Sequence, residues 1–172
     1  MPIYKAPVQD TLFVLKDVLN YQRYGNLAGY ADADPDILEA ILAEGAKLAE
    51  NVLQPTNREG DEKGCVRNAD ASVTTPESFK DAYSQYREGG WLGLAVPQEF
   101  GGQGLPYLVH TAVGEYFSSA NMAFTMYPGL THGAIAAIVE HGTDEQKSAY
   151  LPNMTDGIWT GTMNLTEPHC GT

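Results

Sequence analysis

Four signals for the start of a helix recur along the chain, and apolar residues at helical spacing follow each of them. They are Asp34-Pro35, Thr75-Pro76, Pro106 and Thr143. A side-chain oxygen before the first turn accepts from free backbone N–H groups, and a proline fits the first turn because it has no N–H to lose. Residues 160–166 instead alternate apolar and polar positions, as a half-buried strand does. The sequence predicts an all-α fold with one strand near its C-terminal end.

Prolines and polar runs set the expected limits of these helices. The helix after Asp34 is expected to stop at Pro55, because an interior proline removes a backbone hydrogen bond. Residues 56–75 are polar and predict a surface excursion with at most a small hairpin, and the charges of residues 58–63 are read as a solvated loop. Residues 122–129 predict a less regular segment, followed by a helix that starts at Leu130.

Charge and composition exclude several classes of protein. The 172 residues carry a formal net charge of −12, whereas nucleic-acid binding needs clustered Lys and Arg to meet phosphates. We find neither a run of 18 apolar residues nor a signal peptide, so we expect no membrane span and a cytoplasmic location. Cys65 and Cys170 are expected to be free thiols, because two cysteines make no disulfide framework. The four histidines lack metal-ligand spacing, which predicts no metal site.

A glycine-rich stretch, residues 90–105, allows two interpretations. Gly101, Gly102 and Gly104 are small enough to let a phosphate approach the main chain. However, no Lys-Ser/Thr pair follows as in a P-loop, and the glycine spacing differs from that of a dinucleotide-binding turn. A rigid turn between two helices is the safer prediction.

Three stretches in the right order resemble one known family, the acyl-CoA dehydrogenases. Their order is Gly90–Leu105, Gly142–Pro152 and Thr166–Thr172. The last, Thr-Glu-Pro-x-x-Gly-Thr, is similar to the family's flavin-binding signature, which usually continues with Asp. The N-terminal part and residues 162–172 look most like the 3-methylmercaptopropionyl-CoA dehydrogenase branch.

The resemblance implies a fold, a reaction and partners. The fold would be the family's N-terminal helical domain, bundle-like and up-down, and the reaction the oxidation of an acyl-CoA thioester to its trans-2-enoyl-CoA. FAD would take the hydride, an electron-transfer flavoprotein the electrons, and the intact enzyme would be a dimer or tetramer. The base, a glutamate, belongs to a later helical domain of the family. The 172 residues alone are therefore expected to be inactive and to bind FAD weakly at best.

The resemblance also assigns residues and domain limits. FAD contacts fall on Met163, Leu165, Thr166, Gly171 and Thr172, and substrate contacts on Tyr127, Thr131 and Gly133. No catalytic residue is assigned. The limits are an N-terminal extension with a short helix (1–33), the helical domain (34–157) and the start of a β domain (158–172), whose strand is expected to be frayed or paired with a neighbouring chain. The alternatives are a non-enzymatic helical interaction module and an acyl-CoA oxidase.

Overall fold

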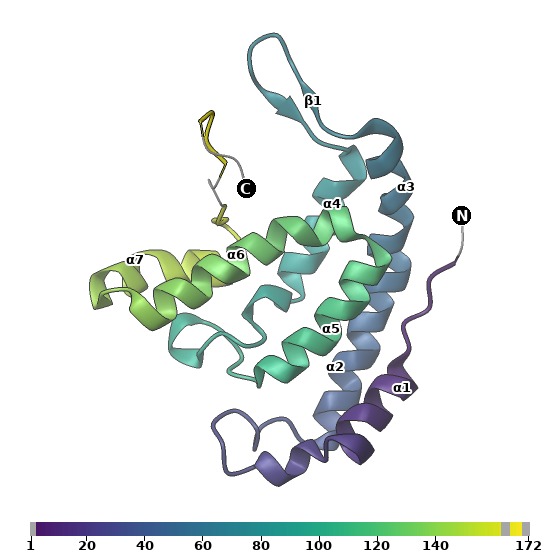
Figure 1. Ribbon diagram of the computed structural model, residues 1–172, viewed down its shortest axis with the longest axis vertical. Coiled ribbons are helices and arrows are strands. Elements are labelled where there is room, and N and C mark those ends of the chain that lie inside the picture. Colours follow the sequence, from purple (N-terminus) through teal and green to yellow (C-terminus); the bar gives the residue numbers. More distant parts are fainter. Residues whose placement is uncertain (1–2, 163–165, 170–172) are drawn as a thin grey trace.

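The structure is a computed structural model that describes residues 3–162 and 166–169, and these residues are predominantly helical (Figure 1). In chain order the elements are α1 (Val8–Phe13), η1 (Val14–Val18), η2 (Tyr21–Tyr24), α2 (Pro35–Leu48), η3 (Ala49–Leu53), α3 (Gln54–Lys63), β1 (Val66–Arg67), β2 (Val73–Thr74), α4 (Glu77–Glu88), η4 (Trp91–Gly93), η5 (Gln98–Phe100), α5 (Tyr107–Ala120), α6 (Met122–His141) and α7 (Asp144–Thr155). The predicted all-α class is confirmed.

The longest helical stretch joins α2, the π-helical turn η3 and α3 without a break (Figure 1). The Asp34 carboxylate accepts from the N–H groups of Asp36 and Ile37, which confirms the predicted cap. The predicted stop at Pro55 is wrong. Pro55 lies in the first turn of α3, directly after the wider turn η3, and at this position its missing N–H costs little.

The charged stretch predicted as a solvated loop is the exposed last part of α3. Two ion pairs at helical spacing cross it, with Arg58 Nε 2.7 Å from a Glu62 oxygen and Lys63 Nζ 2.8 Å from a Glu59 oxygen. Charges four residues apart meet on a helix, so the same residues that indicate a loop also support a helix. The hairpin was expected and is confirmed, with β1 and β2 antiparallel and Val66 opposite Thr74.

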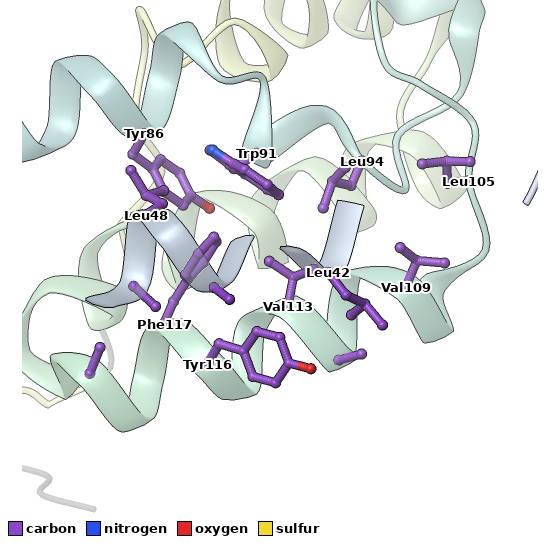
Figure 2. Close-up of a cluster of buried hydrophobic side chains, with 14 of the residues drawn as sticks. Leu42, Leu48, Tyr86, Trp91, Leu94, Leu105, Val109, Val113, Tyr116 and Phe117 are labelled. Atoms are coloured by element: carbon purple, nitrogen blue, oxygen red, sulfur yellow. The ribbon is translucent and has the colours of Figure 1, made fainter. Parts of the chain in front are cut away.

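The main core lies where α2 packs against α5, with α4 and η4 closing one side (Figure 2). Leu42 from α2 is completely buried, and Val113 and Tyr116 from α5 are at most 1% exposed. In Figure 2 the Trp91 ring stands between Tyr86 and Leu94, above this row of α5 side chains. Each fully buried side chain of this size contributes on the order of 2 kcal/mol, so this layer holds the helices together.

The N-terminal segment packs against the core through part of its apolar residues. Of the apolar residues that predict its short helix, only Leu12 and Leu15 are buried, whereas Phe13, Val18 and Leu19 are exposed. The main-chain N–H of Ala6 and the ammonium of Lys5 both donate to the Glu50 carboxylate, at 3.0 and 2.5 Å. These bonds hold the segment against the α2–η3 helix.

The stretch between α4 and α5 is a tight turn, as predicted. The N–H groups of Gln103, Gly104 and Leu105 donate to carbonyls within the same loop at 2.8–2.9 Å. A Cβ on Gly102 would lie 2.0 Å from the Val96 carbonyl oxygen, so a glycine is required there. These amides are already used inside the loop, which weighs against the phosphate-cradle interpretation.

Three further expectations about helix ends have different outcomes. The capping box of Thr143 and Gln146 at the start of α7 is confirmed. Thr75 does not cap α4, because Pro76 occupies the N-cap position and no side chain accepts there. The prediction of a less regular segment before Leu130 is wrong, since α6 runs unbroken from Met122 with Pro128 inside it. Pro128 has no N–H to donate to the Phe124 carbonyl, but the helix continues past it.

Candidate functional site

The three predicted substrate residues all lie on α6, but they do not share one face. Tyr127 is half-exposed, and its ring meets that of Tyr83 edge-on with the centroids 5.2 Å apart. Thr131 is completely buried, and its hydroxyl accepts from the Gly161 N–H at 3.1 Å. Gly133 is exposed, and a Cβ there would meet nothing within 4 Å. Residues four apart on a helix are neighbours, and residues two apart are not. Tyr127 and Thr131 are therefore neighbours on α6, whereas Gly133 lies on another face.

The chain after α7 leads back to this pair. Gly157 turns the chain in a left-handed conformation (φ 70°), and the Tyr83 hydroxyl donates to its carbonyl at 3.0 Å. The hydrogen bond from the Gly161 N–H to the Thr131 hydroxyl then holds the end of this segment, residues 158–161, against α6. The approach to the predicted flavin signature is therefore held beside a predicted substrate residue.

The signature itself is only partly within the described residues. Thr166, Glu167, Pro168 and His169 are exposed, and the contact of Thr166 with the cofactor stays a prediction. The predicted FAD contacts Met163, Leu165, Gly171 and Thr172 lie outside the described residues. Residues 160–162 and Thr166 have no strand structure, and the middle of the predicted strand also lies outside.

An apolar groove of about 360 Å³ lies beside Tyr127, between α4, α6 and the hairpin. Phe79, Tyr83 and Phe124 form its walls, and Lys80 is the charged residue of its lining. Cys65 also lines it as an exposed free thiol, in agreement with the prediction for this cysteine. Cys170 lies outside the described residues.

A second hollow of about 200 Å³ opens between α5 and α6, where sequence analysis predicts no site. Tyr86, Trp91 and Phe117 from the main core form one wall, and Pro128 and Gly129 from α6 form the other. We call this space the α5–α6 cavity.

Two histidines stack at the edge of the α5–α6 cavity. The rings of His110 from α5 and His132 from α6 lie 4.0 Å apart and 14° from parallel, and Tyr107 stacks on His132 at 5.5 Å. Burial, and secondarily the neighbouring His132, lowers the pKa of His110 to about 4, and burial also lowers the pKa of His132. Both rings are therefore neutral at pH 7. Sequence analysis missed the pair because its members are far apart in the chain.

Within the described parts of the chain, no three His, Cys, Asp or Glu side chains are grouped so as to hold a metal ion. α6 is long and apolar enough to cross a membrane by length and composition alone, although the sequence predicts no span. α6 packs against α5 and α7 through a few buried residues, among them Phe124, Thr131 and Ile135, and most of its apolar window is exposed. The absence of a membrane span therefore stays a prediction.

The described residues thus form a helical unit with a groove and a cavity along α6, followed by an exposed Thr-Glu-Pro turn. Residues 36–158 match the family described as acyl-CoA dehydrogenase, N-terminal domain. The chain therefore belongs to the acyl-CoA dehydrogenase family.

Curated relatives give the same result over nearly the full chain. The chain is 39% identical over 98% of its length to 3-methylmercaptopropionyl-CoA dehydrogenase of Ruegeria pomeroyi. It is 35% identical over 99% to the broad-specificity linear acyl-CoA dehydrogenase FadE5 of Mycobacterium tuberculosis. In each case it spans 28% of the relative.

The chain is also similar to one solved structure. That structure comes from a study of the electron transferring flavoprotein of Acidaminococcus fermentans and its mechanism of flavin-based electron bifurcation. The TM-score is 0.64 with 28% sequence identity, over 78% of this chain and 33% of that one.

Proposed function

We propose that these residues form the N-terminal helical part of an FAD-dependent acyl-CoA dehydrogenase. The observation that carries the proposal is the family match over residues 36–158, together with the signature-like turn at Thr166–His169 further along the chain. A fold by itself does not define an activity. The turn supports the proposal because it resembles the flavin-binding signature of the family. The division into 1–33, 34–157 and 158–172 belongs to the same proposal.

The residues needed for the reaction would come partly from these 172 residues and partly from the remainder of the enzyme. FAD would supply the hydride chemistry, with Thr166 and its signature neighbours orienting the ring. Tyr127 and Thr131 would line the path of the acyl group along α6, with Gly133 further along the helix. Proton removal from the carbon next to the thioester needs a base near neutral pH. That base, a glutamate, would come from outside these residues, and the intact enzyme would be a homo-oligomer that reduces an electron-transfer flavoprotein.

The names of the relatives suggest which substrates to compare. The 39% identical relative acts on 3-methylmercaptopropionyl-CoA by name, and relatives from Syntrophomonas wolfei are named butyryl-CoA dehydrogenases. We propose 3-methylmercaptopropionyl-CoA as the substrate of the intact protein. It carries a sulfur where a straight-chain acyl group carries a methylene.

The test is a steady-state assay of the protein encoded by the full reading frame, with an electron-transfer flavoprotein as acceptor. We expect turnover of both acyl-CoA esters, with the higher kcat/KM for 3-methylmercaptopropionyl-CoA, and no turnover by residues 1–172 alone. Oxygen consumption without the acceptor protein would identify an oxidase instead. Activity of the 172 residues by themselves would contradict the proposed division of the site.

A further inference from the structure

A further hollow, of about 220 Å³, lies where the C-terminal ends of α4 and α7 meet the glycine-rich loop. We call it the α4–α7 cleft, and its lining includes Arg87, Gly93, Phe100, Gln103, Thr155 and Asp156. Its described lining contains no residue of α5 or α6, so the cleft is separate from the cavity and the groove along α6. An apolar cavity of roughly 150 Å³ binds benzene in another protein, so the cleft has room for a ligand of about six non-hydrogen atoms.

Close packing fixes two walls of the cleft. Gly93 is buried against α7, where a Cβ would lie 3.2 Å from Cγ2 of Thr155. Gly157 turns the chain just after α7 with a φ of 70°, and a Cβ there would lie 2.7 Å from Cγ of Arg87. The methyl group of Thr155 and the stem of Arg87 are thus held against the main chain. Side chains that are already in place lose less freedom when a ligand binds.

The Thr155 hydroxyl is buried without a partner. Thr155 is 5% exposed, and its Oγ1 makes no hydrogen bond to the part of the chain that the structure describes. A threonine in a helix can bond to a carbonyl three or four residues earlier. Here the Pro152 carbonyl accepts instead from the Asp156 N–H, at 3.1 Å. An unpaired buried hydroxyl costs free energy, which a ligand that bonds to it would recover.

Two opposite charges lie in the lining. Arg87 and Asp156 are both exposed, and no ion pair joins either of them to another described residue. The guanidinium of an arginine presents a planar fork of N–H donors that matches a carboxylate. Asp156 favours a cation, and so do the C-terminal ends of α4 at Glu88 and of α7 at Thr155. The cleft thus offers one place for an anionic group and one for a cationic group.

This arrangement selects the net charge of the ligand. An anion without a cationic group would lie against Asp156 and the two helix ends, in a chain whose formal net charge is −12. A cation without an anionic group would leave Arg87 unpaired and close to a like charge. A zwitterion places each of its charges beside an opposite one and has no net charge itself.

We propose that the α4–α7 cleft binds a small zwitterion of the amino-acid type, whose carboxylate pairs with Arg87 and the Thr155 hydroxyl and whose ammonium group pairs with Asp156. The site consists of described residues, and the proposal does not depend on the proposed function. Its ligand differs in chemical class from the acyl-CoA ester and the FAD of that function.

The experiment titrates the 172-residue chain at pH 7 with three zwitterions, glycine, β-alanine and γ-aminobutyrate, which differ in the separation of their charges. Propionate carries the carboxylate alone and ethylammonium the ammonium group alone. Calorimetry and the amide ¹H and ¹⁵N shifts of Thr155 and Asp156 follow binding. We expect the tightest zwitterion to bind at least fivefold more tightly than either singly charged probe. A smaller preference, or no binding by any of the three zwitterions, would overturn the proposal.

Variants of the cleft test the pairing of each group. Arg87→Gln and Asp156→Asn remove one charge each and should weaken the tightest zwitterion tenfold or more. Thr155→Val replaces the hydroxyl by a methyl group and should weaken it three- to tenfold without lowering the urea midpoint, because the hydroxyl has no partner to lose. Arg67→Gln, on the exposed strand β1 and outside the lining, is the matched control and should leave the affinity unchanged. An unchanged affinity in any of the three cleft variants would contradict the proposed pairing.

Discussion

The two sides of α5 differ in how they are packed. Towards α2, the main core is filled by large apolar side chains that leave almost no exposed area. Towards α6, the same helix borders a cavity with two glycines, a stacked histidine pair and an unpaired nitrogen. The first side accounts for the stability of the fold, and the second has room for a ligand. One helix thus combines a structural face with a candidate binding face.

The largest effect is expected in the packed side. Leu42→Ala should lower the free energy of unfolding by about 2–5 kcal/mol, since Leu42 is completely buried between α2 and α5. Ile37→Ala on the same helix is the control, because Ile37 is 43% exposed and should lose less than about 1 kcal/mol. Urea unfolding followed by circular dichroism measures both. Equal losses would mean that the two faces of α2 do not differ in packing.

Asn121 connects the two sides at the corner between α5 and α6. Its amide donates to Thr56 Oγ1 at 2.8 Å, and its carbonyl accepts from the Phe124 N–H at 3.0 Å. Asn121→Ala should therefore cost about 2–3 kcal/mol, more than the roughly 1 kcal/mol expected for the exposed cap in Asp34→Ala. Comparison of the two urea midpoints tests this order. A smaller loss for Asn121→Ala would show that the corner is not a structural joint.

The cavity side should respond to pH. The pKa of His110 is lowered to about 4 in the folded protein, so between this value and the ordinary 6.5 the unfolded chain binds a proton that the folded chain does not. Stability contributed by neutral His110 is thus present above pH 6.5 and lost as the pH falls towards 4. Between pH 7 and 5.5 we expect a loss of about 1 kcal/mol, allowing for the partial exposure of the ring.

The groups that face His110 are Tyr107 and His132, and the described lining contains no carboxylate to offset its charge. His110→Gln removes the titrating group and should flatten the pH dependence over this interval. An equally steep decline in His110→Gln would assign the pH dependence to other residues.

The smallest effect is expected for two glycines that both lie inside helices, Gly114 in α5 and Gly45 in α2. Gly114→Ala should raise the unfolding free energy by about 0.5–1 kcal/mol, because its Cβ would enter open space. Gly45→Ala should show no such gain, since its Cβ would lie 3.0 Å from Cγ1 of buried Val113. Thermal unfolding of both variants measures the difference. Equal gains would mean that the core is as loosely packed as the cavity.

Local chemistry explains which features the sequence could predict. Caps such as those of Asp34 and Thr143 depend on neighbouring residues alone, and both were predicted correctly. The effect of Pro55 depends on a π-helical turn before it, and that of Pro128 on neighbouring helices that hold α6 together. The α5–α6 cavity needs His110 and His132 to meet across two helices, and no short-range pattern indicates that contact.

The π-helical turn η3 has a consequence for changes in chain length. A residue advances an ideal α-helix by 100°, so the wider turn absorbs about one residue beyond regular winding. Deletion of one residue within Ala49–Leu53 should restore even winding without rotating α3 away from α4 and α6. Deletion of one residue from α2 or α3, in contrast, would rotate their contacts off the core. The same deletion would also place Pro55 inside a regular α-helix, where a proline costs about 3 kcal/mol, so the π-helical turn both sets the register of α3 and accommodates Pro55.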